Sequence, residues 1–196
     1  MLKTIFDNNQ YQDIIEWATT PYQNGLTYKN KDLVSIDNLS TKELRRNAQQ
    51  NEKKWGNKII NAEQNNNWTT QVGEGIVHDV LLKLGKHPKR AKKIDGCCYN
   101  PDWETDDAIW EVKSRTWTTS GTAGEKVFGT MYKYSDLPRI YGKSLYIICV
   151  AYQEWELSNG NTKIFGEISE EKRQFLNLAK SLNIHYIKFS DLLSQL

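Results

Sequence analysis

The stretch PDWETDDAIWEVKSR, at residues 101–115, places acidic residues and a lysine among large apolar ones. Asp102 follows a proline, while Glu111 and Lys113 are separated by a single apolar residue. Acids and lysines are rarely fully buried unless they are paired. The competing interpretation is an exposed hairpin whose glutamate and lysine form a surface ion pair, which contributes little to stability.

Two strand-like runs flank the polar residues ETDD, and this arrangement predicts a β-hairpin. Because alternate residues of a strand share a face, we expect Glu111 and Lys113 to point to the same side. Trp110 and Val112 then point to the opposite side, into apolar packing. If ETDD is the turn, Asp102 lies across the hairpin, close to Glu111.

This grouping of charges suits a hydrolytic metal site. Two converging carboxylates repel each other, which raises one pKa unless a cation lies between them. Carboxylate oxygens are ligands for Mg²⁺, with Mn²⁺ as a substitute, so Asp102 and Glu111 are the candidate metal ligands. Lys113 can orient the attacking water or stabilise developing negative charge. The expected chemistry is metal-assisted hydrolysis of a phosphodiester.

The combination of Pro101-Asp102 with Glu111-Val112-Lys113 resembles the PD-(D/E)XK nuclease superfamily. The resemblance covers roughly residues 70–151, and the small size looks most like Type II restriction endonucleases. It implies a restriction-endonuclease-like mixed central β-sheet, dependence on Mg²⁺ and cleavage that leaves 5′-phosphates. An E-x-K tripeptide alone is common, and the preceding proline–aspartate pair and the apolar strand add to the signal.

Two further acids are candidates for the same site. Asp95 lies on the same predicted strand as Asp102 and also precedes Glu111, so it is an alternative first metal ligand, although Asp102 is favoured. Glu74 lies on a predicted helix, one turn before His78. Members of the superfamily often carry an acid on the equivalent helix, so Glu74 is a candidate catalytic residue, and a solvent-facing glutamate is the alternative.

Basic residues gather on both sides of the motif, although the net charge of +2 does not by itself indicate a nucleic-acid partner. Neutralisation of backbone phosphates supplies much of the affinity for nucleic acids, so these clusters predict binding of double-stranded DNA. Charge runs are also ordinary solvated surfaces. The candidate DNA-binding residues are Lys89, Arg90, Lys92, Lys93, Arg45, Arg46, Arg115 and Lys126.

The remaining patterns predict an α/β fold, with one mixed sheet flanked by helices. Helices are expected over 5–18, 41–64, a segment at 70–85 that starts late because of two glycines, and 170–182. Strands are expected in SLYIICVAY, TKIFGEI and HYIKF. A single domain over 1–196 then has a helical part, 1–66, for DNA recognition or dimerisation and a catalytic core, 67–196.

The composition limits the compartment and the type of metal site. Three cysteines without a CxxC pair argue against a disulfide framework and against structural zinc. No apolar run has the length of a membrane span, and the N-terminus does not read as a signal peptide. We therefore expect a cytoplasmic protein without a membrane partner.

The favoured function is a sequence-specific double-strand DNA endonuclease of the Type II restriction kind, working as a homodimer on a palindromic site. A cognate DNA methyltransferase is then expected in the same system, although not as a bound partner. One alternative is a structure-selective or mismatch-repair nicking nuclease of the same fold. Another is a nucleic-acid-binding module with an inert site, which the intact acids and lysine disfavour.

Overall fold

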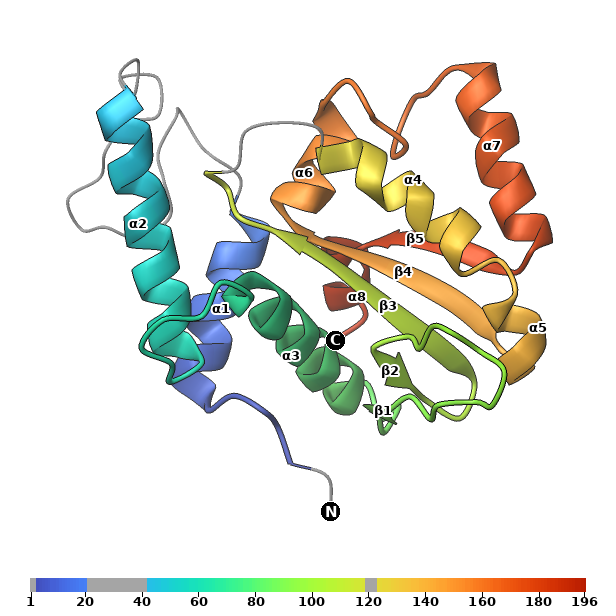
Figure 1. Cartoon of the computed structure of the whole chain (residues 1–196), viewed down its shortest axis with the longest axis horizontal. Helices are drawn as coiled ribbons and strands as arrows, with labels where there is room; N and C mark the ends of the chain where they lie inside the picture. The colour runs from blue at the N-terminus through green and yellow to red at the C-terminus, as the bar shows by residue number, and fades with distance from the viewer. Residues whose placement is uncertain (1–2, 21–41, 119–122) are drawn as a thin grey trace.

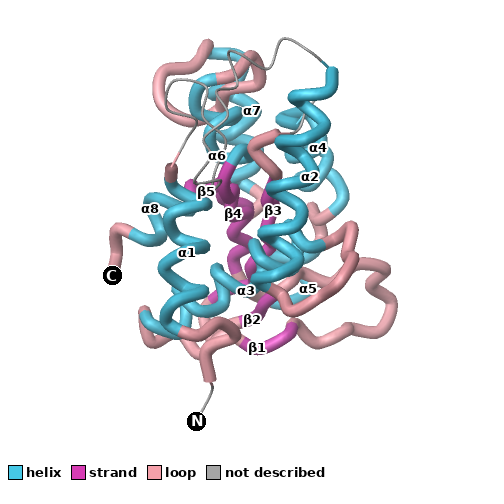
Figure 2. The backbone as a smooth tube through the Cα atoms, turned by 90° about the vertical axis from the view of Figure 1, so that its left-hand side faces the viewer, coloured by secondary structure: helices cyan, strands magenta, loops and turns pink. Residues whose placement is uncertain are grey.

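The computed structural model describes residues 3–20, 42–118 and 123–196, with the side chains of 42–45 and 123–124 left out. Its elements form a mixed five-stranded sheet surrounded by helices, as Figures 1 and 2 show. The predicted coarse class, α/β with helices flanking a mixed sheet, is confirmed. None of the helices in the described ranges is both long and apolar enough to cross a membrane.

The strands follow one another across the sheet in sequence order, β1-β2-β3-β4-β5. The first two pairings are antiparallel, and the last two are parallel. The long, apolar β3 and β4 form its centre, whereas β1 and β2 are two residues each. The bounds are β1 (Lys89–Arg90), β2 (Trp103–Glu104), β3 (Ala108–Arg115), β4 (Ser144–Ala151) and β5 (Ile184–Lys188).

Helices cover both faces of the sheet. One face carries a core shared with α1, α3 and α8, and the opposite face carries a core shared with α4 and α7 (Figure 1). Short helices α5 and α6 flank β4 along the chain. The bounds are α1 (Asn8–Thr19), α2 (Lys42–Ile59), α3 (Trp68–Lys83), α4 (Ala123–Lys133), α5 (Leu137–Tyr141), α6 (Tyr152–Asn159), α7 (Glu170–Ser181) and α8 (Phe189–Leu193).

Alternation along β3 assigns its side chains to the two faces as predicted. Trp110 and Val112 belong to the core beneath α1, α3 and α8. Ile109 belongs to the opposite core, so Glu111 and Lys113, which share its face, point toward the α4 side. The register of the sheet therefore places two charged side chains at the border of an apolar core.

Three expectations from the sequence are wrong. The run before Trp103 is mostly an exposed, polar loop and not a long strand. In this part of the chain, only the two-residue strands β1 and β2 pair in the sheet. The segment TKIFGEI is not a strand and instead packs Ile164 against the core. Helix α3 begins at Trp68 rather than late, despite Gly73 and Gly75.

The two glycines of α3 allow close packing that offsets their cost to the helix. A Cβ at Gly73 would lie 2.5 Å from the Cβ of Ser114 on β3. A Cβ at Gly75 would lie 2.6 Å from the ring of Phe6. Both positions are buried, so α3 approaches β3 and the N-terminal segment more closely than any larger residue permits.

The N-terminal helices are joined to the core by one buried carboxylate. Glu52 of α2 is 2% exposed, and it accepts hydrogen bonds from the indole of Trp17 at 3.0 Å and from the backbone of Trp117 at 2.9 Å. The backbone and hydroxyl of Thr118 also donate to Glu52. Helix α2 is therefore fastened to the segment that directly follows β3.

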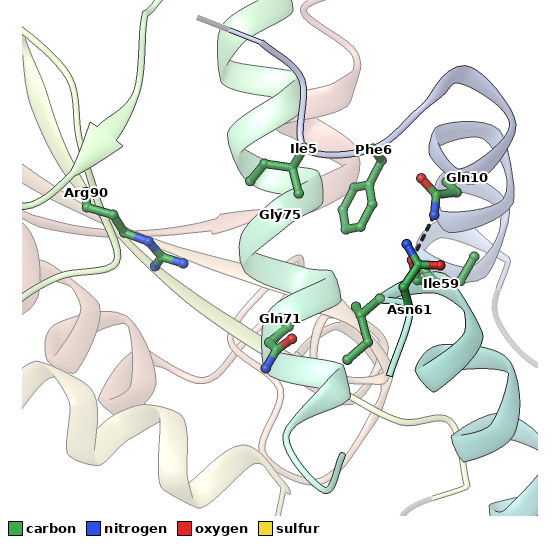
Figure 3. A pocket seen from close by; sticks show the side chains of 9 residues that line it. Ile5, Phe6, Gln10, Ile59, Asn61, Gln71, Gly75 and Arg90 are labelled. Carbon is green, nitrogen blue, oxygen red and sulfur yellow. Dashed lines mark hydrogen bonds between the residues drawn. The ribbon is translucent and has the colours of Figure 1, made fainter. Parts of the chain in front are cut away.

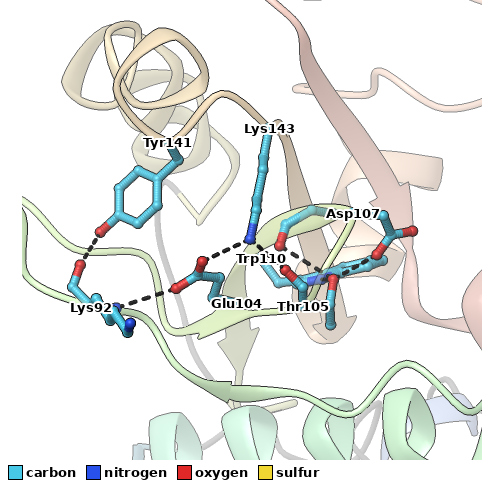
Figure 4. A network of polar contacts seen from close by, with 8 residues as sticks. Lys92, Glu104, Thr105, Asp107, Trp110, Tyr141 and Lys143 are labelled. Carbon is cyan, nitrogen blue, oxygen red and sulfur yellow. Dashed lines mark hydrogen bonds and ion pairs between the residues drawn. The ribbon is translucent and has the colours of Figure 1, made fainter.

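The turn of the β2–β3 hairpin is held by a polar network, shown in Figure 4. Lys143 donates to the carboxylate of Glu104 and to the carbonyl of Thr105, each at 2.7 Å. The hydroxyl of Thr105 donates to Asp107 at 2.7 Å and accepts from the indole of Trp110 at 3.0 Å. This network fixes the hairpin at the end opposite to Asp102 and Glu111.

Candidate active site

The shortness of β2 leaves part of the edge of β3 open beside Asp102. Pairing between the two strands ends at Trp103 and Trp110, and continuing the same register places Asp102 opposite Glu111. The Oδ2 atom of Asp102 accepts the backbone N–H of Val112 at 2.7 Å. The carboxylate thus satisfies a backbone donor of β3 and is held beside Glu111.

Glu111 is deeply buried and only half satisfied. Its side chain accepts through Oε1 from Lys113 and, at 3.1 Å, from the hydroxyl of Tyr134. Its Oε2 atom is buried and has no hydrogen-bond partner within the described part of the chain. Because buried polar atoms are normally paired, this oxygen can accept a ligand or a water from solution.

Glu74 reaches the same place from α3 and is held by Arg90. The guanidinium donates to Oε2 of Glu74 at 2.6 Å and lies 4.0 Å from the ring centre of Trp103. The indole of Trp103 donates to the carbonyl of Glu74 at 2.9 Å. The register of β1, which pairs Arg90 with Trp103, places this guanidinium beside Glu74. Its predicted contact with DNA stays a prediction, since the Arg90 side chain is also exposed.

These side chains line one cavity of about 370 Å³. It brings together all four predicted catalytic residues and two of the predicted DNA-binding residues, Arg115 and Lys126. The lining consists of Thr70, Glu74, Asp102, Glu111, Val112, Lys113, Ser114, Arg115, Lys126, Val127 and Gln153.

A second cavity of about 400 Å³ lies between the N-terminal segment, the end of α2 and α3 (Figure 3). Arg90 points toward this cavity from β1, and Gly75 of α3 lines it. Apart from Arg90, its lining residues are uncharged, and none of the predicted catalytic residues borders it. The two cavities therefore differ in chemistry, and only the first gathers carboxylates.

The crowding of carboxylates perturbs their protonation. Burial, then the neighbouring charges of Glu111 and Glu74, raise the pKa of Asp102 to about 8. Burial also raises the pKa of Glu111, although Lys113 and the hydroxyl of Tyr134 oppose this shift. A cation placed between the carboxylates would relieve both effects.

The donor set fits Mg²⁺ bound with substrate. Asp102 and Glu111 each provide a carboxylate, and the unpaired Oε2 atom of Glu111 is available as a ligand. Within the described ranges, no three His, Cys, Asp or Glu side chains are close enough to hold an ion on their own. Mg²⁺ commonly uses one or two carboxylates and completes its shell with waters and substrate phosphate, so two carboxylates suffice.

The other predicted site residues lie outside the cavity. Asp95 is exposed in the loop before β2, so the structure brings Asp102 and not Asp95 to Glu111. The side chain of Arg45 is outside the described part of α2. The remaining predicted DNA-binding residues, Lys89, Lys92, Lys93 and Arg46, are exposed.

Two lining or supporting residues were missed by the sequence analysis. Tyr134 lies just after α4 and contacts Glu111, but nothing in its local pattern distinguishes it from a core tyrosine. Gln153 lines the cavity from α6, directly after the most apolar strand. A polar residue at the end of a buried strand is the one signal that could have found it.

Comparison of the chain with protein-family models, with curated proteins and with solved structures finds no match.

Proposed function

We propose that this protein is a Mg²⁺-dependent endonuclease of the PD-(D/E)XK superfamily that cuts double-stranded DNA at a specific sequence, as Type II restriction enzymes do. The observation that supports this most is the convergence of Asp102, Glu111, Lys113 and Glu74 on one cavity. Three separate segments supply them, from α3, from the residue before β2, and from β3. A surface ion pair between Glu111 and Lys113 alone does not account for the burial of Glu111 at 3% exposure.

The side chains divide the work of hydrolysis between them. Asp102 and Glu111 would hold the metal ion, and Glu74 would orient a water next to them. Mg²⁺ held there would supply activation of that water and polarisation of the phosphate. Lys113, beside Glu111, donates a hydrogen bond to the negative charge that develops on the phosphate oxygens. The product is a 5′-phosphate.

Positive charge at the cavity supports a DNA substrate, and the number of catalytic sets supports a homodimer. Arg115 and Lys126 border the cavity and supply positive charge for the DNA backbone. One Asp–Glu–Lys set cuts one strand, so a homodimer on a palindromic sequence supplies the two sets that a double-strand cut needs. The polar surface of α2, which is fastened to the segment after β3 through Glu52, is the candidate for reading bases.

Incubation of supercoiled plasmid with the protein and Mg²⁺ tests this proposal. We expect discrete linear fragments that carry 5′-phosphates. The Asp102→Ala and Lys113→Ala variants should bind DNA without cutting it. Asp95→Ala is the matched control because Asp95 is exposed and lies outside the cavity, and it should cut normally.

Other outcomes separate the alternatives. Nicked circles that persist at saturating protein would favour a structure-selective or repair nickase of the same fold. Plasmid that stays supercoiled with Mg²⁺ and with Mn²⁺ would contradict the proposal. Light scattering of the protein on DNA distinguishes a dimer from a monomer.

A further inference from the structure

Gln153 is a buried side chain without a partner in the cavity that holds Asp102 and Glu111. It is 3% exposed and is the second residue of α6. Its Nε2 donor has no hydrogen-bond partner within the described residues. A buried donor without an acceptor costs free energy, so its presence needs a reason beyond packing.

The backbone before Gln153 is strained in a way that sets its position. Strand β4 ends at Ala151, which pairs in parallel with Arg115 of β3. Ala151 has φ 56° and ψ −130°, a conformation that residues other than glycine rarely adopt. Such strain persists when the surroundings impose it, and it is common at functional sites. Here the sharp turn starts α6 at the cavity wall and buries the amide there.

Among the described residues, the cavity therefore holds two buried polar atoms of opposite kind that have no hydrogen-bond partner. The Oε2 atom of Glu111 is an acceptor and can bind a cation. The Nε2 atom of Gln153 is a donor and calls for an acceptor. A metal ion with an anionic oxygen beside it satisfies both, whereas a metal ion alone leaves the donor unpaired. Arg115 and Lys126 line the same cavity and add positive charge near the anion.

We propose that Gln153 binds the substrate, donating its amide N–H to an anionic oxygen of the phosphodiester held at Asp102 and Glu111. This inference rests on the proposed function and adds a residue to it. The donor is itself buried, and a hydrogen bond from a buried donor to an anion contributes more than one on the surface.

The test compares Gln153→Met and Gln153→Leu with Gln174→Leu, in which an exposed glutamine of α7 is replaced. Both cavity variants keep the volume and remove the donor. Three quantities are measured for each protein: the free energy of unfolding without metal or DNA, the affinity for a labelled mixed-sequence duplex in Ca²⁺, and the single-turnover rate of plasmid cleavage in Mg²⁺.

We expect Gln153→Met and Gln153→Leu to unfold at the same or a higher urea concentration than the wild-type protein, since an unpaired buried donor has been removed. Their cleavage rates should fall about 10- to 100-fold, and their affinity for the duplex should weaken. Gln174→Leu should match the wild-type protein in duplex affinity and cleavage rate. This combination, with stability kept and catalysis lost, is not expected of a residue that only supports the fold.

The opposite results separate this inference from the proposed function. If the wild-type protein cuts DNA and both Gln153 variants cut equally well, Gln153 does not bind substrate and the proposed nuclease stands. If both variants lose stability, the fold itself pairs the amide, and the inference is overturned. If the wild-type protein neither binds nor cuts DNA, both proposals fail.

Discussion

Asp102 and Glu104 are two residues apart at the same hairpin, but their carboxylates have different neighbours and opposite pKa shifts. Glu104 is paired with Lys143 at 2.7 Å and also accepts the backbone N–H of Lys92 at 3.5 Å. Although burial opposes it, the hydrogen bond from Lys143 lowers the pKa of Glu104. Asp102 has Glu111 and Glu74 as neighbours instead, and burial, followed by these two charges, raises its pKa to about 8.

The difference shows which end of the hairpin is complete without a ligand. At the turn, each buried charge meets an opposite charge or a backbone donor, so the network adds stability (Figure 4). At the open edge of β3, the carboxylates of Asp102 and Glu111 share too few donors. A cation from solution would supply the missing partner, which is the arrangement that a metal-dependent site requires.

The largest expected effect is on the cleavage rate, when one carboxylate is neutralised at the open end and, in a separate variant, one at the turn. On the proposed function, Glu111→Gln removes a proposed metal ligand and should lower the cleavage rate by about 1000-fold, while the free energy of unfolding without metal stays the same or rises. Glu104→Gln, its matched control, should cut at the wild-type rate per folded molecule. Cleavage assays and urea denaturation measure both. Equal loss of cleavage in the two variants would remove the distinction between the two ends.

Breaking the pair at the turn should affect stability alone. Lys143→Met leaves Glu104 buried without its main partner and should lower the free energy of unfolding by about 2–4 kcal/mol at pH 7. Because the folded pKa of Glu104 is lowered, this stabilisation is present above the unfolded pKa and is lost as the pH falls through the folded value. The loss in the variant should therefore shrink in acid. The double variant with Glu104→Met should recover much of it, and urea denaturation at several pH values checks both statements.

The open end should show the opposite dependence on pH. The pKa of Asp102 is about 8 in the folded protein and 3.8 for a free side chain, so the folded state binds more protons between these values. Without metal, this group makes the protein less stable as the pH rises from about 4 to about 8. Asp102→Asn should remove that slope and raise the free energy of unfolding by about 1–2 kcal/mol at pH 8. An unchanged slope would mean that Asp102 is not crowded by its neighbours.

The sequence predicted the geometry of the hairpin better than the elements that frame it. Alternation was enough to put Glu111 and Lys113 on one face and Trp110 on the other, because strand periodicity is a local property. The turn was placed within one residue, since Glu104 belongs to β2 and the turn begins at Thr105.

What the sequence did not reveal depends on contacts between distant segments. The pairing of Arg90 with Glu74 depends on the register of β1 against β2, which composition does not show. The close approach of α3 to β3 depends on Ser114, which meets Gly73 and donates a hydrogen bond to the carbonyl of Thr69. Gln153 reaches the cavity only because the chain turns sharply at Ala151.

The smallest expected effect concerns a neutral donor to Glu111, the hydroxyl of Tyr134. The hydroxyl of Tyr134 donates to Oε1 of Glu111 at 3.1 Å. Burial, and then the charge of Glu111, raise the pKa of Tyr134 far above its ordinary value, so this hydroxyl keeps its proton at any working pH. The hydrogen bond lowers the pKa of Glu111, and its loss should raise that pKa further.

Tyr134→Phe should therefore shift the acid limb of the rate profile to higher pH and slow cleavage by only about 2- to 10-fold near neutrality. Tyr132→Phe is the matched control, since Tyr132 lies on α4 but is 89% exposed. The profile of the control should coincide with that of the wild-type protein. A Tyr134→Phe profile that is lower but not displaced would show that the hydroxyl supports packing rather than the protonation state of Glu111, and the partial compensation at the open end would then rest on Lys113 alone.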